Sequence, residues 1–205
     1  MINLGYDKVV FKRTRFVVKR DKNTGKRELN LRGMNINDIM EVVGLQNICN
    51  LQVLNLSKNR IERIEGMEPL TSLEVLHLDN NALETIPGLD ALVNLKYLDL
   101  SRNQIKEIEG LDNLQKLEVL KLNFNLIKEI SGLENLINLK ELHLKKNSIT
   151  KVKGLGQLTR LQKLDLRSNL IDDIDGIQDL KELDSLGLEG NKIDTYMLRK
   201  YRKFH

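Results

Sequence analysis

The sequence predicts a right-handed solenoid of the α/β class, with short parallel strands on its concave face and short 3₁₀ or irregular legs on its convex face. A 22-residue unit recurs seven times from residue 51 onward, without insertion or deletion. Leucine fills positions 1, 4 and 6 of every unit, and asparagine fills position 9. A unit of this size cannot bury its own apolar face, so it has to stack on its neighbours. The seven units begin at Leu51, Leu73, Leu95, Leu117, Leu139, Leu161 and Leu183.

The first element is expected to be a β-type, hairpin-like cap formed by residues 1–28. Two β-rich runs, at residues 9–11 and 16–18, precede the sequence KNTG at residues 22–25, which is a turn signal. An open solenoid has to cover its first core layer. We therefore expect strands or a hairpin within residues 6–31 that cover the first turn.

The solenoid itself is expected to span residues 29–193, and its first unit, residues 29–48, is degenerate. Leu29 and Leu31 occupy the equivalents of positions 4 and 6. Met34 replaces the asparagine of the regular units. The stack is therefore expected to contain one irregular unit followed by seven regular ones.

Positions 3 to 7 of each unit have the pattern of a strand with one buried face. Leucines at positions 4 and 6 alternate with variable residues at positions 3, 5 and 7. Strands from successive turns lie parallel and about 4.8 Å apart. Each leucine that points into the shared core contributes roughly 1.5–3 kcal/mol.

The asparagine at position 9 is expected to form a structural ladder at the bend that follows each strand. Its amide carries two donor hydrogens and an acceptor oxygen. We expect it to bond backbone groups of its own turn and the next, which burial leaves without water. The ladder consists of Asn59, Asn81, Asn103, Asn125, Asn147, Asn169 and Asn191.

The rest of each unit is expected to form a tight return leg. Ile or Leu at position 11 and Ile or Val at position 14 suit one 3₁₀ turn, and too few residues remain for a full helix. Position 16 is glycine in six units and is expected to adopt backbone angles closed to residues with a Cβ. These glycines are Gly66, Gly88, Gly110, Gly132, Gly154 and Gly176.

Residues 194–205 are expected to form a short helical cap, so that the chain is one folding unit. Asp194 can cap a short helix. The apolar residues that follow fall at helical spacings. They are Met197, Leu198, Tyr201 and Phe204.

Composition favours a reducing compartment. The chain has 205 residues and one cysteine, Cys49, which excludes an intramolecular disulfide framework. The N-terminus lacks the apolar core of a signal peptide, and no apolar stretch approaches the roughly 20 residues that cross a bilayer. We expect a cytoplasmic protein, or a nuclear one if the source is eukaryotic, with no membrane association.

Function is expected on the concave face, where side chains at positions 3, 5 and 7 are free of core packing and positions 8 and 10 form the edge. Aromatic and aliphatic side chains gather there among charged ones, which is typical of a protein-binding hot spot. The candidate partner-binding residues are Val75, His77, Tyr97, Asp99, Arg102, Val119, Lys121, Phe124, Leu126 and His143.

A structural role is the alternative for part of this set. Valines at outward positions favour strands and stabilise a sheet without any partner. Phe124 can pack along its loop. Tyr97 is therefore the strongest single candidate for binding.

No catalytic residue, cofactor or metal site is expected. His77 and His143 share a column but lie three turns, or about 14 Å, apart, which is too far to ligate one ion. His77 can meet Asp79 or Asp99, yet no nucleophile stands beside either pair. The acidic run at residues 172–175 lacks a calcium-loop pattern. Phosphate-binding, paired zinc-ligand and nucleophile-elbow motifs are missing from the sequence.

The repeat, as in LEVLHLDNNALETIPGLDAL and LKELHLKKNSITKVKGLGQL, resembles the leucine-rich repeat family over about residues 26–193. The 22-residue period with asparagine at position 9 is most similar to the short subclass found in a regulatory subunit of protein phosphatase 1. The resemblance implies a rigid, non-catalytic scaffold that binds a partner protein on its concave face. A regulatory role, with a phosphatase catalytic subunit as the partner, is one form that the resemblance implies.

Two alternatives come from other features. Residues 1–28 carry a net charge of +6 and residues 192–205 carry +4, so residues 29–191 carry −6 of the total of +4. Basic ends can attract nucleic acid, although the acidic body and the scarcity of aromatic residues argue against that partner. Similar repeats also occur in bacterial internalins, which suggests an adhesin. We expect a monomer that takes no small-molecule substrate.

Overall fold

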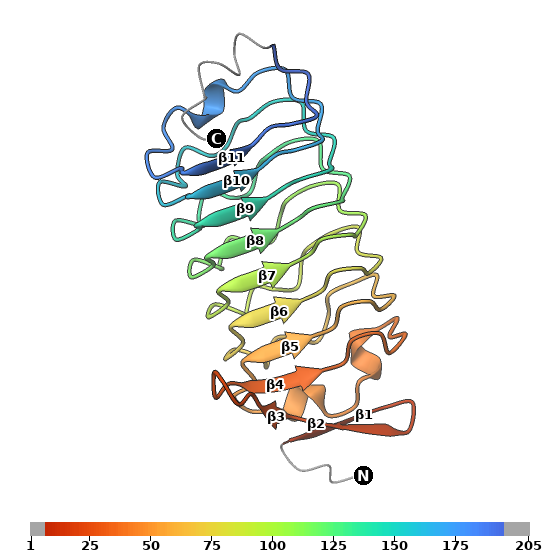
Figure 1. The fold of residues 1–205 in the computed structure, drawn as a ribbon. Helices are drawn as coiled ribbons and strands as arrows, with labels where there is room; N and C mark the ends of the chain where they lie inside the picture. The colour runs from red at the N-terminus through yellow and green to blue at the C-terminus, as the bar shows by residue number, and fades with distance from the viewer. Residues whose placement is uncertain (1–6, 195–205) are drawn as a thin grey trace.

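The computed structural model describes residues 7–194 and shows a coil whose strands stack edge to edge (Figure 1). One strand comes from each turn, and consecutive turns pair in parallel. This arrangement confirms the predicted parallel-strand solenoid. The strands of the regular units are β5 (Val53–Asn55), β6 (Val75–His77), β7 (Tyr97–Asp99), β8 (Val119–Lys121), β9 (Glu141–His143), β10 (Lys163–Asp165) and β11 (Ser185–Gly187).

The pairing register of these strands equals the sequence period. Leu98 on β7 pairs with Leu120 on β8, which pairs with Leu142 on β9. All three side chains are fully buried, as are the leucines at positions 1, 4 and 6 of the central turns. The apolar residues form one continuous core that extends from Val9 to Leu188.

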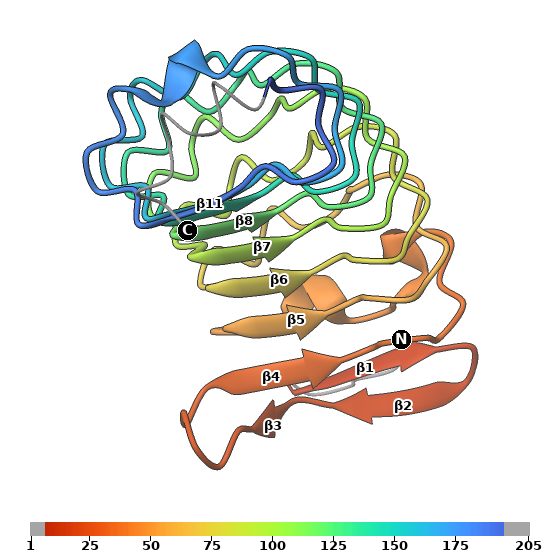
Figure 2. The same ribbon diagram turned by 45° about the horizontal axis from the view of Figure 1, so that its top comes forward.

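The N-terminal segment forms the predicted β-type cap. Strands β1 (Lys8–Phe11) and β2 (Thr14–Val17) make an antiparallel hairpin. Strand β3 (Lys19–Arg20) then turns back to β4 (Arg27–Asn30), and β4 pairs in parallel with β5. The hairpin lies at the open end of the coil, beside β4 (Figure 2). It closes that end of the core, because Val9 of β1 is fully buried.

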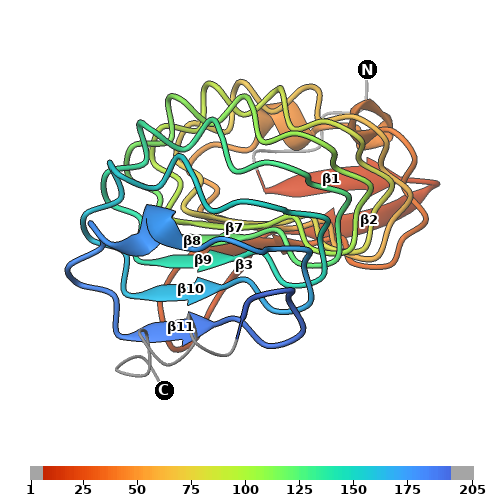
Figure 3. The same ribbon diagram turned by 90° about the horizontal axis from the view of Figure 1, so that it is seen from above.

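The return legs run along the side of the coil opposite the sheet (Figure 3). Two of them contain short 3₁₀ helices: η1 (Ile39–Glu41) and η2 (Leu45–Asn47) lie in the leg between β4 and β5, and η3 (Asp175–Ile177) lies in the leg between β10 and β11. Residues 7–194 contain no α-helix, so helical structure there is limited to these turns. Within that range no helix is long and apolar enough to cross a membrane. The helical cap expected over residues 194–205 lies, apart from Asp194, outside the described residues.

The glycines at position 16 do not all serve the expected purpose. Gly88 has φ +107°, and a Cβ there would lie 2.0 Å from the carbonyl oxygen of Ile64 on the preceding turn. Gly176 does not have a positive φ, so the expectation is wrong at this position. A Cβ on Gly176 would nevertheless lie 1.9 Å from the carbonyl oxygen of Val152. Close packing of successive legs therefore excludes a side chain there, whatever the backbone angles.

The asparagine ladder forms, but its direction differs from the expected one. The Asn125 amide nitrogen donates to the carbonyls of Leu122, in its own turn, and Leu100, in the preceding turn. Its oxygen accepts from the Ile105 amide, also in the preceding turn. The Leu100 amide already bonds Lys121 of the following turn, and in an extended strand the carbonyl of the same residue points the same way. That carbonyl is therefore within reach of Asn125 in the following turn, and it accepts from Asn103 of its own turn as well.

Candidate functional site

We call the outward side chains at positions 3, 5 and 7 of the strands the sheet face. The parallel register places Tyr97 of β7 between Val75 of β6 and Val119 of β8. Each of these side chains is partly buried while the leucines beneath them fill the core. The sheet face thus carries an apolar column with an aromatic residue at its centre.

Polar side chains surround Tyr97 on this face. Its ring centre lies 5.1 Å from that of His77, with the two planes inclined by 48°. The Lys121 ammonium lies 5.1 Å from the Tyr97 ring centre, within the range of a cation–π contact. The Tyr97 hydroxyl donates to Asp99 Oδ2 over 3.4 Å. The structure therefore brings six of the sequence-predicted binding residues together. Val75 and Val119 flank Tyr97, while His77, Asp99 and Lys121 contact its ring or hydroxyl.

Burial and charge set the protonation states of this group. Burial lowers the pKa of His77, although the charges of Asp99 and Asp79 act in the opposite direction. Burial also raises the pKa of Tyr97. For Lys121, burial acts to lower the pKa, but the hydrogen bond with Tyr97 and neighbouring carboxylates raise it overall. At neutral pH the face therefore presents a neutral imidazole beside a charged ammonium.

Phe124 belongs to a second column, at position 8, where each regular unit turns away from the sheet. Every position-8 residue has a left-handed backbone, and Phe124 has φ +58°. A bulky residue rarely adopts this conformation. The Arg102 guanidinium carbon lies 4.1 Å from the Phe124 ring centre, and the Lys146 ammonium lies 4.9 Å from it. Phe124 is thus held by cations from both neighbouring turns.

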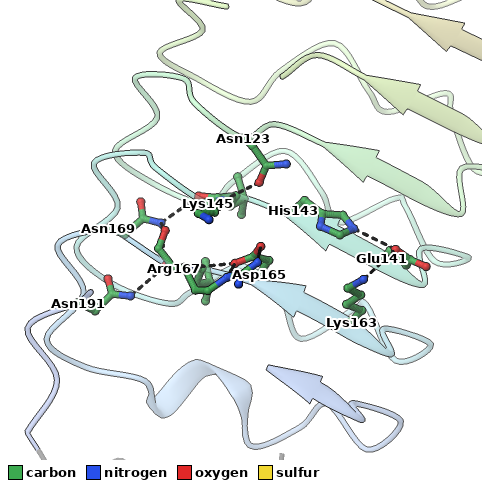
Figure 4. A network of polar contacts seen from close by, with 11 residues as sticks. Asn123, Glu141, His143, Lys145, Lys163, Asp165, Arg167, Asn169 and Asn191 are labelled. Atoms are coloured by element: carbon green, nitrogen blue, oxygen red, sulfur yellow. Dashed lines mark hydrogen bonds and ion pairs between the residues drawn. The ribbon is translucent and has the colours of Figure 1, made fainter. Parts of the chain in front are cut away.

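Ion pairs occupy the C-terminal part of the sheet face (Figure 4). His143 Nε2 lies 2.9 Å from Glu141 Oε2, and Lys163 Nζ lies 3.9 Å from the same oxygen. The hydrogen bond with His143 lowers the pKa of Glu141. Arg167 pairs with Asp165 over 2.6 Å. His143 is therefore bound to its own strand rather than gathered into the group around Tyr97.

The sequence places Leu126 at the edge of the concave face, and in the structure its side chain lies beside the return legs. Its side chain is 48% exposed and lines a hollow of about 770 Å³ with return-leg residues, including Lys106, Ile108 and Lys128. The asparagine at position 9 points inward, so the chain has already turned the corner by position 10. Leu126 is consequently separated from the other predicted binding residues.

Two members of these groups were left out of the predicted binding residues, although the sequence analysis already placed Asp79 within reach of His77. Lys146 was not among the predicted binding residues, although its position 22 residues after Phe124 signals the contact. Asp79 lies with His77 and Asp99, and the ligand atoms of these three residues all lie within 4.8 Å of one another. Among residues 7–194 this is the group whose donor atoms suit a metal ion.

Two of the nine cations of the basic N-terminal cap, Lys26 and Arg27, form ion pairs. Glu74 Oε2 lies 3.1 Å from Lys26 Nζ and 3.0 Å from Lys96 Nζ. Hydrogen bonds from Gln52, Lys96 and Lys26 lower the pKa of Glu74 to about 2. Arg27 pairs with Asp7. These pairs reduce the charge that the cap offers to a nucleic acid.

The repeats match a known family model. The model describes leucine-rich repeats in two copies and matches residues 49–91, 93–135 and 137–179. The three matches begin 44 residues apart, which is two 22-residue units, and together they cover more than half of the chain. No curated protein sequence matches the chain significantly.

Several solved structures have a similar fold. A leucine-rich repeat protein of Leptospira interrogans is 32% identical over 78% of this chain, with a TM-score of 0.73. The chain spans 43% of that protein's length. Internalin C2 of Listeria monocytogenes is 25% identical over 78% of this chain and 80% of its own, with a TM-score of 0.65. An internalin F structure from the same species is 22% identical over 92% of this chain and 75% of its own, with a TM-score of 0.51, and its likeness bears on the fold alone.

Proposed function

Because the chain belongs to the leucine-rich repeat family, we propose that it is a non-catalytic scaffold that binds a partner protein on its sheet face, as a monomer. The observation that carries this proposal is the Val75–Tyr97–Val119 column. A partly buried aromatic residue flanked by aliphatic ones is the usual centre of a binding hot spot, and charged neighbours form its rim. The core does not need these outward side chains, so they are available for binding.

The charges around the column indicate the kind of surface that the partner presents. Arg102 and Lys146 hold the Phe124 ring, and Lys121 lies over Tyr97. These cations favour a partner whose apolar contact residues are bordered by carboxylates, because complementary charges speed association and select partners.

The test compares two double variants in affinity capture from extract of the source cells. Tyr97→Ala with Phe124→Ala removes both aromatic residues. Val93→Ala with Ile137→Ala removes two exposed apolar side chains, 46% and 52% exposed, that lie outside the strands. A partner held by the wild type should be lost with the first variant and kept with the second. With the purified partner, Kd should rise by at least about tenfold for the first variant.

Equal capture by wild type and the aromatic double variant would contradict the proposal, provided that both proteins have the same circular dichroism spectrum and melting temperature. Loss of capture with the Val93/Ile137 control alone would contradict the sheet face as the binding surface and would place binding at the segments that precede the strands.

A regulatory role toward a protein phosphatase catalytic subunit is the narrower form of the proposal. It is supported by the resemblance to the 22-residue subclass. Titration of this chain with a purified phosphatase 1 catalytic subunit tests it directly. Saturable binding that weakens with the aromatic double variant supports this partner, whereas no binding at micromolar concentrations rejects it and leaves the broader proposal intact.

An adhesin role is a second candidate, supported by the similarity to internalin C2 over most of both chains. The partner would then be a protein on another cell rather than one in the same cytoplasm. Treating intact source cells with a protease distinguishes the two settings. Digestion of the chain on intact cells supports the adhesin, and protection until the cells are lysed supports a cytoplasmic scaffold.

A further inference from the structure

His77, Asp79 and Asp99 form a compact group of metal-ligating side chains on the sheet face. One ligand atom from each lies within 4.8 Å of the other two. His77 ends β6, and its register partner on β7 is Asp99. Asp79 lies two residues after His77, so the alternation of the strand directs both side chains to the same face. The fold itself therefore assembles the group from two adjacent turns.

Neighbouring groups orient both carboxylates. Asp79 Oδ2 accepts from the Asn80 side-chain amide over 2.7 Å. Asp99 Oδ1 accepts from the Ser101 backbone amide over 3.0 Å. The Tyr97 hydroxyl bonds the other Asp99 oxygen, and its ring packs on His77. Such outer contacts hold metal ligands in place and typically change affinity by about 10–100-fold when removed.

The His77 imidazole is suited to donate a lone pair. Within residues 7–194 no backbone or side-chain group hydrogen-bonds either of its ring nitrogens. A neutral imidazole beside two carboxylates is a donor set that zinc and similar ions bind, whereas calcium prefers six to eight oxygen ligands.

We propose that His77, Asp79 and Asp99 bind one divalent transition-metal ion, with Zn²⁺ as the best fit. Zinc takes nitrogen and oxygen ligands at about 2.0–2.2 Å, so ligand atoms around one ion lie at most about 4.4 Å apart, and small side-chain rotations bring the three donors within that range. Three protein ligands leave a fourth position for water. The site does not depend on the proposed protein partner.

The charge of Lys121 gives a second test of the proposed metal site. Its ammonium lies over Tyr97 and interacts electrostatically with both His77 and Asp99. A fixed positive charge at this position opposes binding of a cation. Replacing Lys121 by methionine, which keeps the length and removes the charge, should therefore strengthen metal binding by several-fold.

The experiment is isothermal titration of the full chain with Zn²⁺ alone, in a Cys49→Ser, His205→Ala background that removes the single thiol and a terminal imidazole. We expect one ion per chain. His77→Phe, which keeps a ring against Tyr97, and Asp99→Asn should each weaken binding by at least about tenfold. Asp79→Asn gives the same test at a residue outside the strands. Ca²⁺ should not compete at equal concentration.

His143→Ala is the matched control, because His143 occupies the same column position as His77 but is bound to Glu141 beside Lys163. This variant should leave the Zn²⁺ affinity unchanged. The proposal is overturned if the parent protein does not bind Zn²⁺ at micromolar concentration. It is also overturned if all three ligand variants, shown to be folded by circular dichroism, bind as the parent does. A Lys121→Met variant that binds more weakly would contradict the placement of the ion.

Discussion

The Arg102 guanidinium carbon lies 4.1 Å from the centre of the Phe124 ring, across two adjacent turns of the coil. The residues are 22 positions apart, and Lys146 approaches the same ring from the turn on the other side. All three share a left-handed backbone, with φ between +56° and +58°. The repeat thus aligns their side chains into a ridge beside the sheet, where cation–π contacts offset part of the backbone cost at Phe124.

A double-mutant cycle should detect this contact. Arg102→Ala and Phe124→Leu should each lower stability slightly, and their coupling free energy should be about 0.5–1 kcal/mol, as for an exposed cation–π pair. Urea unfolding followed by circular dichroism measures all four corners of the cycle. Arg160→Ala, in a different leg, should be additive with Phe124→Leu. Coupling near zero for the Arg102 pair would mean that the ring holds its position without the cation.

Asn125→Ala should destabilise the protein by about 2–4 kcal/mol. The change leaves the Ile105 amide without its partner in a buried setting, and it removes one of the two asparagine hydrogen bonds to each of the carbonyls of Leu100 and Leu122. A buried group left without its partner costs about 1–3 kcal/mol, and the two further lost hydrogen bonds add to this. Asn123→Ala, two residues earlier on the sheet face, should cost less than about 1 kcal/mol. Chemical denaturation compares the two. Equal costs would contradict the role of the position-9 ladder.

Leu120→Ala should cost about 2–5 kcal/mol, because it opens a cavity in a fully buried site. Val119→Ala changes the preceding residue of the same strand, which points outward, and should cost under about 1 kcal/mol. Thermal unfolding of both variants provides the comparison. A melting temperature unchanged by Leu120→Ala would contradict the placement of Leu120 in the shared core.

Gly176→Ala should be strongly destabilising for a purely steric reason. The new Cβ would lie 1.9 Å from the Val152 carbonyl oxygen, so one leg must move away from the next. Gly156→Ala is the control, because it has no positive φ and no heavy atom within 4 Å of the new Cβ. That control should be neutral or stabilise by about 0.4–1 kcal/mol, since alanine restricts the unfolded chain. The difference between their urea midpoints is the measurement.

Glu74 should make stability depend on acid pH. Its pKa is about 2 in the folded protein, below the value of 4.5 that it has without its partners. A lowered pKa stabilises the fold fully above about pH 4.5, and this contribution disappears as pH falls from 4.5 toward 2. Since Lys26 and Lys96 remain partly exposed, the contribution is on the order of 1–2 kcal/mol. The unfolding free energies of wild type and Glu74→Gln are measured at pH 7 and at pH 3. The difference between the two proteins should be smaller at pH 3 than at pH 7.

Residues of the core were predictable from the sequence, whereas several features at its surface were not. Leu98 and Leu120 were predictable because an apolar residue every 22 positions has a single consistent place in a stacked coil. The hairpin at β1 and β2 was predictable because its β-rich runs precede the first turn. The direction of the Asn125 bonds was not, because it depends on which way the free carbonyls of the preceding strand point. Leu126 was expected at the edge of the concave face, whereas its side chain lies beside the return legs, because the chain has turned away from the sheet by position 10.

The sequence by itself determined the coil, its period, its buried leucines and its inward asparagines, since burial of a repeated apolar pattern permits one stacking register. Only the tertiary structure decided which outward side chains meet. The grouping of His77, Asp79 and Asp99 and the enclosure of Phe124 by Arg102 and Lys146 depend on the register between turns and on the left-handed backbone at position 8. The outward positions do not follow the periodic apolar pattern that makes the core predictable. The backbone geometry of the folded coil is therefore what brings these residues together.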